Sequence, residues 1–474
     1  MGADKVSTSR VNPLRDLKRI TQIDQEVVWH PYTQMSEYAK ADPLIIQRGE
    51  GPYLYDVRRR RFLDAYGSMW CNVWGHCHPE LVAAIQGQAA KLCHSSLFSA
   101  THEAAIDFAY KLVEYIKLDF RFADDPPSLN HVFFSDNGST AVEVAMKMAL
   151  QYQNQIGQLR RQQFLVFEGS YHGDTIGAMS AGSIETFTRK FSSVMFNVHR
   201  APYPMQIEPG DRPGNWRTAE RAMEAQLAGL SDRLAAVIIE PVMQGASGMR
   251  PLAEDYLGRV KKYCREYGIL LITDEVFTGF CRTGPLIASS QELVEPDIMC
   301  LGKGITGGTL PMAVTVASDR VHEAFKGEWS EMKHMLHGHT YSGNPLACAA
   351  ASKNLDMIEE YKLGGLVKQS AREFTQLLKD RVQKHPRVGL IRQRGLAIGV
   401  PIKNPAGQDD LGHEEDGGYE QRAEAQKVCQ AAYEKRVLLR PLGNVITIVP
   451  PLNIETEQIE EIVNALAEAL KVLG

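Results

Sequence analysis

Short apolar segments alternate with longer amphipathic stretches between residues 130 and 320. The apolar segments have the length of β-strands, whereas the longer stretches repeat apolar positions every three or four residues, as one face of a helix does. Strict alternation of strand and helix predicts a mostly parallel sheet with helices on both faces. The expected elements are strand 131–134, helix 139–152, strands 164–167 and 236–240, helix 257–267, and strands 269–273 and 298–301.

A different pattern begins near residue 345. Two long helical stretches, two short strands and a final amphipathic segment predict a smaller α+β domain, entered without a flexible linker. These elements are expected at 346–361, 370–382, 395–400, 437–440 and 455–472. We therefore expect an α/β protein in three parts: an N-terminal segment that packs with the small domain (1–65), a large domain (66–345) and a small C-terminal α+β domain (346–474).

The composition is that of a globular enzyme, with 474 residues of which 44% are hydrophobic and 23% charged. A net charge of only -5 provides no overall basic field, which argues against nucleic acid or an anionic membrane as a partner. The four arginines from Arg58 to Arg61 are a local exception. They lie between two short strand-like segments, so we interpret them as a solvated hairpin turn.

Eight cysteines are spread along the chain without a CxxC pair, and we expect no secretory leader. Reduced thiols in the cytoplasm are the simplest explanation. His76, Cys77 and His78 could suggest a metal, but three consecutive side chains rarely converge on one ion, so we expect no metal site. We also expect no membrane span, because no apolar stretch approaches the length of one.

Lys303 and Asp274 indicate the chemistry. Asp274 ends the apolar run 268–273, and Lys303 follows it by 29 residues, between two glycines. A lysine amine can form an imine with an aldehyde cofactor, and an aspartate at the end of a buried strand can keep a pyridine nitrogen protonated. Each residue alone is more often a solvated lysine or a helix-capping aspartate. In this order, the pair predicts pyridoxal phosphate (PLP).

A nucleotide phosphate loop is the alternative for Gly302-Lys303. That loop requires a glycine five residues before the Gly-Lys pair and a serine or threonine after it. Asp297 and Gly304 occupy these places, so this alternative is excluded.

Further polar residues follow other predicted strands. Asp136 and Glu240 both come directly after one, and ligands of parallel sheets bind beyond the carboxyl ends of strands. We therefore expect them to lie close to Asp274 and Lys303. Gly138 and Ser139 begin the next helix, whose free N–H groups can bind a phosphate, although a capped helix without a ligand would explain the same residues.

Tyr171 and Glu240 complete the residues that can be interpreted by themselves. Tyr171 follows a predicted strand, and its ring could cover a flat pyridine ring, although core packing is an equal explanation. Glu240 would be a buried carboxylate that orders its neighbours by hydrogen bonding.

Five motifs, in this order and along nearly the whole chain, resemble the class III aminotransferases of PLP fold type I. The motifs are Asn137-Gly138-Ser139, Tyr171-His172-Gly173, Asp274-Glu275-Val276, Gly302-Lys303-Gly304 and Gly338-His339-Thr340-Tyr341-Ser342-Gly343-Asn344-Pro345. The resemblance implies that Lys303 binds the cofactor and moves the substrate proton, that Asp274 pairs with the pyridinium nitrogen, and that Tyr171 covers the ring. It also implies that Gly138 and Ser139 hold the phosphate, joined by His339 and Thr340 of a second copy in a homodimer.

Within this family, the chain is most similar to the members that convert 8-amino-7-oxononanoate to 7,8-diaminononanoate in biotin biosynthesis. The similarity lies in segment 29–35, in Trp70, in Asp174 and in the segment that begins at Arg440. It implies that Tyr32, Trp70 and Gly338 shape the substrate pocket, and that Arg440 binds the carboxylate of the keto substrate. Asp174 and Arg282 would adjust the recognition of two different substrates.

Two molecules remain possible as the amino donor, S-adenosylmethionine and lysine. Family frequency favours S-adenosylmethionine, while Gly338-His339-Thr340 and the segment 304–311 resemble the lysine-using branch. Another class III ω-aminotransferase, acting on a diamine or an ω-amino acid, is the nearest alternative enzyme. A PLP-binding protein without turnover is an alternative from a different class.

Overall fold

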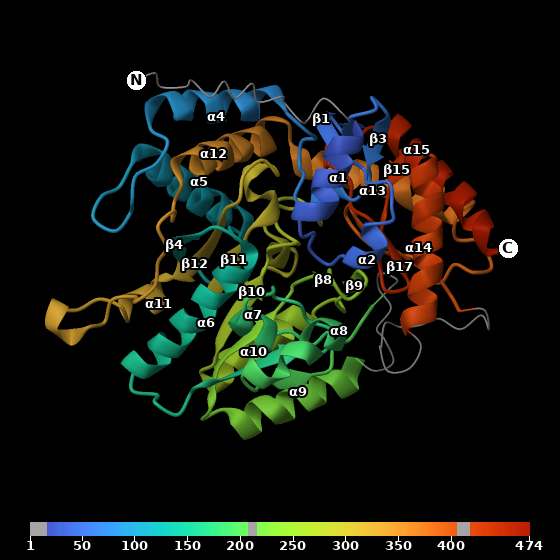
Figure 1. The fold of residues 1–474 in the computed structure, drawn as a ribbon. Coiled ribbons are helices and arrows are strands. Elements are labelled where there is room, and N and C mark those ends of the chain that lie inside the picture. The colour runs from blue at the N-terminus through green and yellow to red at the C-terminus, as the bar shows by residue number, and fades with distance from the viewer. Residues whose placement is uncertain (1–16, 207–215, 405–417) are drawn as a thin grey trace, which may run out of the picture.

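The computed structural model describes residues 17–206, 216–404 and 418–474. A seven-stranded sheet in the order β4-β12-β11-β10-β7-β5-β6 forms its centre (Figure 1). Only β12 runs antiparallel to its neighbours, so the mostly parallel sheet predicted from the alternation is confirmed. The strands are β4 (Leu129–Ser135), β5 (Gln163–Phe167), β6 (His199–Ala201), β7 (Leu234–Ile239), β10 (Leu270–Asp274), β11 (Ile298–Leu301) and β12 (Ala313–Ser318).

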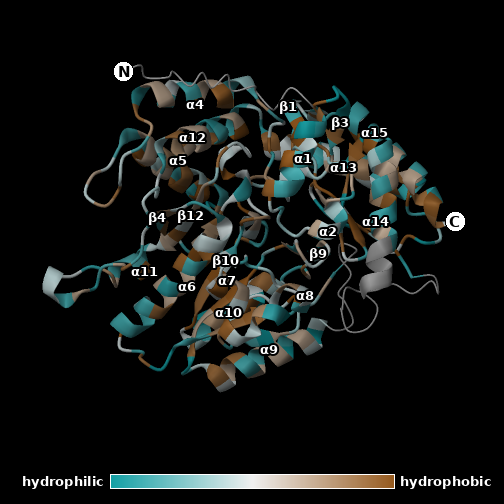
Figure 2. Ribbon diagram, in the orientation of Figure 1, coloured by the Kyte–Doolittle hydropathy of each residue, from teal (hydrophilic) through white to brown (hydrophobic). Residues whose placement is uncertain are grey.

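Helices cover both faces of this sheet, because its inner strands are apolar on both sides. Ile238 of β7 packs in the cluster of α6 (Gly138–Gln155), whereas its neighbours Val237 and Ile239 pack on the other face with α9 (Trp216–Leu230) and α10 (Tyr256–Tyr267). Burial of each such side chain contributes about 1.5–3 kcal/mol. In Figure 2 the strands are mostly brown, while teal residues lie on the outer helices.

The C-terminal part contains an antiparallel sheet in the order β13-β14-β17-β16. Leu63 of the N-terminal segment pairs with Val437 across β3 and β15, which joins that segment to the C-terminal part. The division into three domains remains a prediction. The elements are β1 (Ile46–Glu50), β2 (Tyr53–Asp56), β3 (Arg61–Asp64), α12 (Pro345–Glu360), α13 (Leu363–Arg381), β13 (Arg392–Arg394), β14 (Ala397–Pro401), α14 (Gly418–Glu434), β15 (Val437–Leu438), β16 (Arg440–Leu442), β17 (Val445–Ile448) and α15 (Thr456–Ala469).

Two local differences from the expected elements have physical reasons. Helix α13 begins at Leu363, seven residues before the predicted start at 370, because buried Leu363 and Val367 outweigh the weak helix propensity of two glycines in its first turn. The arginine-rich turn does join β2 and β3 as a hairpin. Two of its arginines are paired rather than only solvated, Arg58 with Asp42 and Arg60 with Asp56.

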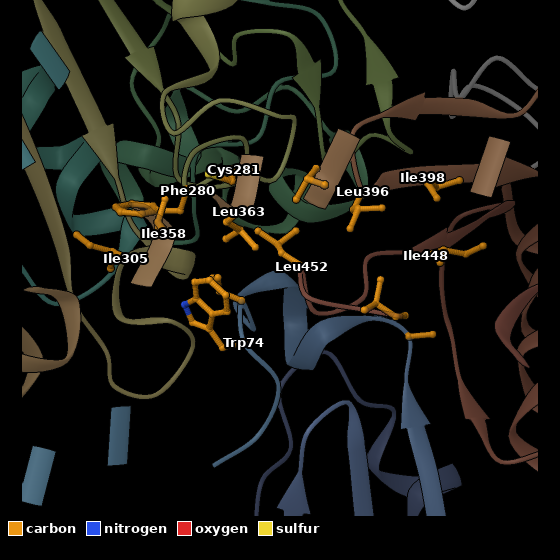
Figure 3. Packing of buried hydrophobic residues seen from close by; sticks show 14 of the residues in the cluster. Trp74, Phe280, Cys281, Ile305, Ile358, Leu363, Leu396, Ile398, Ile448 and Leu452 are labelled. Atoms are coloured by element: carbon orange, nitrogen blue, oxygen red, sulfur yellow. The ribbon is translucent and has the colours of Figure 1, made fainter. Parts of the chain in front are cut away.

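A hydrophobic core unites residues that are far apart in sequence (Figure 3). Trp74, Phe280 and Ile305 of the predicted large domain meet Leu363 and Leu452 of the small one. The tight packing expected from the missing linker is therefore visible as one shared cluster.

The histidine–cysteine run makes other contacts than metal ligation. His76 Nε2 lies 2.9 Å from Asp64 Oδ2, and Cys77 is exposed. Across the described ranges, no group of three or more His, Cys, Asp or Glu side chains is placed to hold a metal ion. Among the described helices, none has both the length and the apolar character that crossing a membrane requires.

Candidate active site

A cavity of about 730 Å³ opens beyond the carboxyl ends of β4, β7, β10 and β11. Asp136, Glu240, Asp274 and Lys303, each at or just after the end of one of these strands, all line it. The convergence expected from the sequence is therefore present. The wall also includes Trp70, Cys71, Gly138, Ser139, Tyr171, His172, Asp174, Thr175, Val276, Phe277 and residues 308–312.

Lys303 reaches the cavity from a strained position after β11. Its backbone adopts a positive φ of 44°, and its ammonium nitrogen lies 5.0 Å from the ring centre of Trp70 and 5.3 Å from that of Phe277. Burial among these rings lowers the pKa of Lys303, opposed by the charges of Asp274 and Glu240. A lysine with a lowered pKa is suited to act as a nucleophile and a proton carrier near neutral pH.

Asp274 is held by His172 and by the backbone. His172 Nδ1 lies 2.7 Å from Asp274 Oδ2, and the N–H of Val276 donates to Asp274 Oδ1 at 3.1 Å. Although burial opposes the charged ring, the bond to Asp274 and the charges of Asp274 and Glu240 raise the pKa of His172. The carboxylate is thereby fixed in the wall of the cavity.

Glu240 is buried beside this pair. Its two oxygens accept hydrogen bonds from the N–H of Tyr171 at 3.1 Å and of Gly245 at 3.0 Å. Burial raises the pKa of Glu240 to about 7, while the charge of His172 acts in the opposite direction. Glu240 thus orders backbone groups that flank the cavity, as its position after a strand suggested.

Gly138 and Ser139 form the first turn of α6, whose N-cap Asn137 closes a capping box with Thr140. A Cβ atom at Gly138 would lie 2.5 Å from a methyl group of Val276. A Cβ atom at Gly173 would lie 2.2 Å from Ser139 Oγ, and Gly173 has a φ of +126°. Neither position has room for a side chain, so the two glycines let the backbone segments pack closely. Both glycines and Ser139 line the cavity beside the free N–H groups of a helix start, where an anion binds well.

An aromatic cluster lies beside Tyr171 and Asp174 of the cavity wall. The hydroxyl of Tyr32 donates to Asp174 Oδ1 at 2.7 Å, and the ring of Phe187 meets both Tyr32 and Tyr171 edge-on. Partial burial and the bond to Asp174 raise the pKa of Tyr32 to about 12. Burial, together with Asp174 and Tyr32, also raises the pKa of Tyr171.

Arg282 does not occupy the place expected of a substrate ligand. Its buried guanidinium donates to the carbonyl oxygens of Asn72, Leu396 and Pro450, and it is absent from the described cavity wall. Burial lowers its pKa to about 9. This geometry does not favour direct contact between Arg282 and the substrate. The side chain instead joins Asn72 to Leu396 and Pro450 of the C-terminal part.

Arg440 and the segment 338–340 lie outside the wall formed by the described residues. The buried Nε of Arg440 donates to no described residue, and the charge of Arg440 acts on the hydroxyls of Tyr32 and Tyr66. Gly338 and Thr340 are exposed and His339 is half-buried. Within one chain, the structure does not bring these three residues to the cavity.

Comparison with known proteins identifies the family. The model of the class III aminotransferases matches residues 35–470. The chain belongs to the class III aminotransferases. The adenosylmethionine-8-amino-7-oxononanoate aminotransferase of Geobacter sulfurreducens is 38% identical over 97% of this chain and 98% of its own length, and that of Aquifex aeolicus is 39% identical over 97% and 98%.

Solved structures of aminotransferases share this fold. The enzyme of the same name from Methanocaldococcus jannaschii has a TM-score of 0.87 at 37% identity, covering 96% of this chain and 99% of that one. A PLP-bound amine transaminase from an uncultivated Pseudomonas species has a TM-score of 0.85 at 32% identity, covering 95% and 99%. The expected PLP fold type I and the dependence on PLP are thereby confirmed.

The residues of this class III aminotransferase fit the cofactor. The glycine-lined hollow at α6 suits a phosphate, the fixed carboxylate of Asp274 suits a pyridinium nitrogen, and the amine of Lys303 suits an aldehyde. The individual roles of the site residues remain predictions.

Sequence reasoning assigned no role to several residues that the structure places at this site. His172 contacts Asp274, Thr175 contacts Ser139, and Phe277 lies beside Lys303. His172 stood within a recognised motif, but the contacts of His172 and Thr175 join segments that are far apart in sequence. No local pattern in the chain predicts such a contact.

Proposed function

We propose that this enzyme transfers an amino group from S-adenosylmethionine to 8-amino-7-oxononanoate, forming 7,8-diaminononanoate for biotin synthesis. The observation that carries the proposal is the near-complete coverage of relatives named for that activity, at 38% and 39% identity. The cavity chemistry agrees with it, because Lys303, Asp274 and Tyr171 stand together at the ends of the sheet strands.

When bound, PLP supplies an electron sink that stabilises negative charge on the substrate carbon. Asp274, oriented by His172, holds the pyridine nitrogen in its protonated form. Lys303 Nζ would carry the proton between the substrate carbon that bears the amino group and the cofactor. Its lowered pKa favours the neutral amine that this task requires. Tyr171 and Trp70 line the cavity that includes Lys303 and would limit the access of water to the reacting carbon.

Arg440 is our candidate for binding the carboxylate of the keto substrate. Its guanidinium lies near Tyr32, and its buried Nε has no acceptor among the described residues. A guanidinium can bind a carboxylate through two parallel hydrogen bonds. Tyr32, Trp70 and Asp174 would shape the path between Arg440 and Lys303, and Asp174 provides an anion for a cationic donor.

We further infer a homodimer with shared sites. Gly338, His339 and Thr340 do not line the cavity of their own chain, so each copy would offer these residues to the cavity of the other. The eight cysteines are free thiols, which agrees with a reducing compartment such as the cytoplasm.

Separate half-reactions test the proposal. S-adenosylmethionine should convert the bound cofactor to its amine form, seen as loss of its visible absorbance, and 8-amino-7-oxononanoate should restore the absorbance. Lysine, pyruvate and 2-oxoglutarate are the comparison substrates. A loss of absorbance with lysine but not with S-adenosylmethionine would mean that lysine is the amino donor. Restoration by pyruvate but not by 8-amino-7-oxononanoate would indicate a different ω-aminotransferase.

A further inference from the structure

The two walls of the predicted phosphate hollow are tied together by side chains. Ser139 belongs to the first turn of α6, and Thr175 ends the loop that begins at Tyr171. Ser139 Oγ lies 2.7 Å from Thr175 Oγ1 and accepts a hydrogen bond from Thr175 N at 3.1 Å. These contacts set how far apart the walls stand.

Glu143 holds the far side of this connection. It lies one turn further along α6, and its Oε1 accepts from the hydroxyl of Thr175 at 2.6 Å and from the N–H of Ala178 at 3.0 Å. Gly177 makes room for it, because a Cβ atom there would lie 2.1 Å from Glu143 Oε2. One carboxylate therefore anchors both the loop and the helix that follows it.

This anchor replaces an ordinary helix cap. Thr175 is the N-cap of α7 (Ile176–Ser180), yet its side chain makes no capping bond. Glu143 accepts instead from Ala178, the third residue of α7, which is where an N-cap side chain normally binds. Helix α7 thus depends on a side chain of α6 for its first turn.

The direction of the hydroxyl chain follows from the donors available. A carboxylate only accepts hydrogen bonds, so the proton of Thr175 Oγ1 points to Glu143. In the contact with Thr175, Ser139 must then be the donor. The Ser139 hydroxyl is fixed by two bonds to Thr175, and the N–H groups of Gly138 and Ser139 remain at the helix start to face an anion.

We propose that Glu143 is a positioning residue for the cofactor phosphate, acting through Thr175 on the width of the hollow between α6 and the 171–175 loop. The inference rests on the assignment of PLP to this cavity but not on the identity of the amino donor or acceptor. Glu143 itself does not line the cavity, so its effect on phosphate affinity would be indirect.

The test compares two ligands of the apoenzyme, pyridoxamine 5′-phosphate and pyridoxamine, in binding titrations. The dissociation constant of pyridoxamine divided by that of pyridoxamine 5′-phosphate reports the contribution of the phosphate alone. Glu143→Ala and Thr175→Val should each reduce this ratio about 10-fold, as expected for loss of a hydrogen bond to a charged group. Glu143→Gln should stay close to wild type, because an amide oxygen in the place of Oε1 accepts the same two bonds.

The double variant Glu143→Ala/Thr175→Val should be no worse than Glu143→Ala, because both changes break one chain of contacts. Asn154→Ala, an exposed position on α6, is the matched control and should leave the ratio unchanged.

If Glu143→Ala does not fold, Thr175→Val still tests the proposal. An unchanged ratio, or equal weakening of both ligands, would overturn it. So would a Glu143→Gln variant as weak as Glu143→Ala, because charge rather than position would then matter. None of these measurements uses a substrate, so they stand apart from the test of the reaction.

Discussion

His172 Nδ1 lies 2.7 Å from Asp274 Oδ2, and both side chains are buried at the carboxyl end of β10. The ring thus supports the carboxylate that we assign to the pyridinium nitrogen. His172→Ala should leave the cofactor bound but lower kcat about 10- to 100-fold, the usual effect of losing a residue that orients a ligand. Steady-state kinetics would measure this. His131→Ala removes a similar contact, 2.9 Å to Asp319, far from the cavity, and should not change kcat.

Lys303→Ala should retain the fold but abolish turnover, because the amine that binds the cofactor and carries the proton is removed. Loss of a general base alone typically costs about 10² to 10⁴ in rate. The visible absorbance of the bound cofactor should disappear during dialysis of the variant, whereas Lys326→Ala should behave as wild type. Turnover near the wild-type level in purified Lys303→Ala would refute its assignment.

Arg440→Ala should mainly weaken the binding of the keto substrate. Truncation leaves the substrate carboxylate unpaired, at a cost of about 2–5 kcal/mol if the pair is desolvated. The rate of the donor half-reaction should change much less, and stopped-flow absorbance can follow the two halves separately. Arg436→Ala, at an exposed arginine just before β15, is the control. Equal losses in both half-reactions would mean that Arg440 has a structural role.

Tyr32→Phe should raise KM more than it lowers kcat, because it removes the hydroxyl that orients Asp174. The effect of Asp174→Ala should shrink in the Tyr32→Phe background, with a coupling free energy of about 0.5–3 kcal/mol. A double-mutant cycle on kcat/KM measures this coupling. Tyr38→Phe breaks a comparable bond, 2.6 Å to Asp24, and is the matched control. Additive effects would show that the Tyr32–Asp174 bond is irrelevant to catalysis.

The buried Glu240 should make the stability of the apoenzyme depend on pH. Burial raises its pKa from 4.5 to about 7, so the folded state binds a proton more tightly than the unfolded state does. The resulting contribution to the free energy of unfolding is present at low pH. It is lost as pH rises from about 4.5 to 7 and amounts to at most about 3 kcal/mol. His172, with its raised pKa, acts in the same direction.

Urea unfolding of the wild type and of Glu240→Gln at several pH values tests this dependence. The free energy of unfolding should fall less with rising pH in the variant, and the difference between the curves isolates Glu240 from other carboxylates. Glu266→Gln, an exposed substitution, should follow the wild type. Parallel curves for wild type and Glu240→Gln would contradict the assigned pKa.

The helices and strands of the large domain could be predicted where a segment carries its own signal. Val237, Ile238 and Ile239 are apolar in succession, which is typical of a strand buried on both faces, and β7 has that environment. The start of α13 was missed because Gly364 and Gly365 weaken the local signal, whereas Leu363 and Val367 are fixed by packing. Strand β12 was not among the expected strands, and its reversed direction could not be predicted either, because strand direction depends on the connections between strands rather than on periodicity.

The sequence by itself determined that Asp136, Glu240, Asp274 and Lys303 meet, because the carboxyl ends of the parallel strands of one sheet lie along the same edge. Only the tertiary structure decided which side chains support them. The bond of His172 to Asp274, the anchor of Glu143 on Thr175 and the placement of Arg282 against three carbonyl oxygens all join residues that are distant along the chain. Such contacts depend on loop paths and on helix rotation, which no periodic pattern encodes.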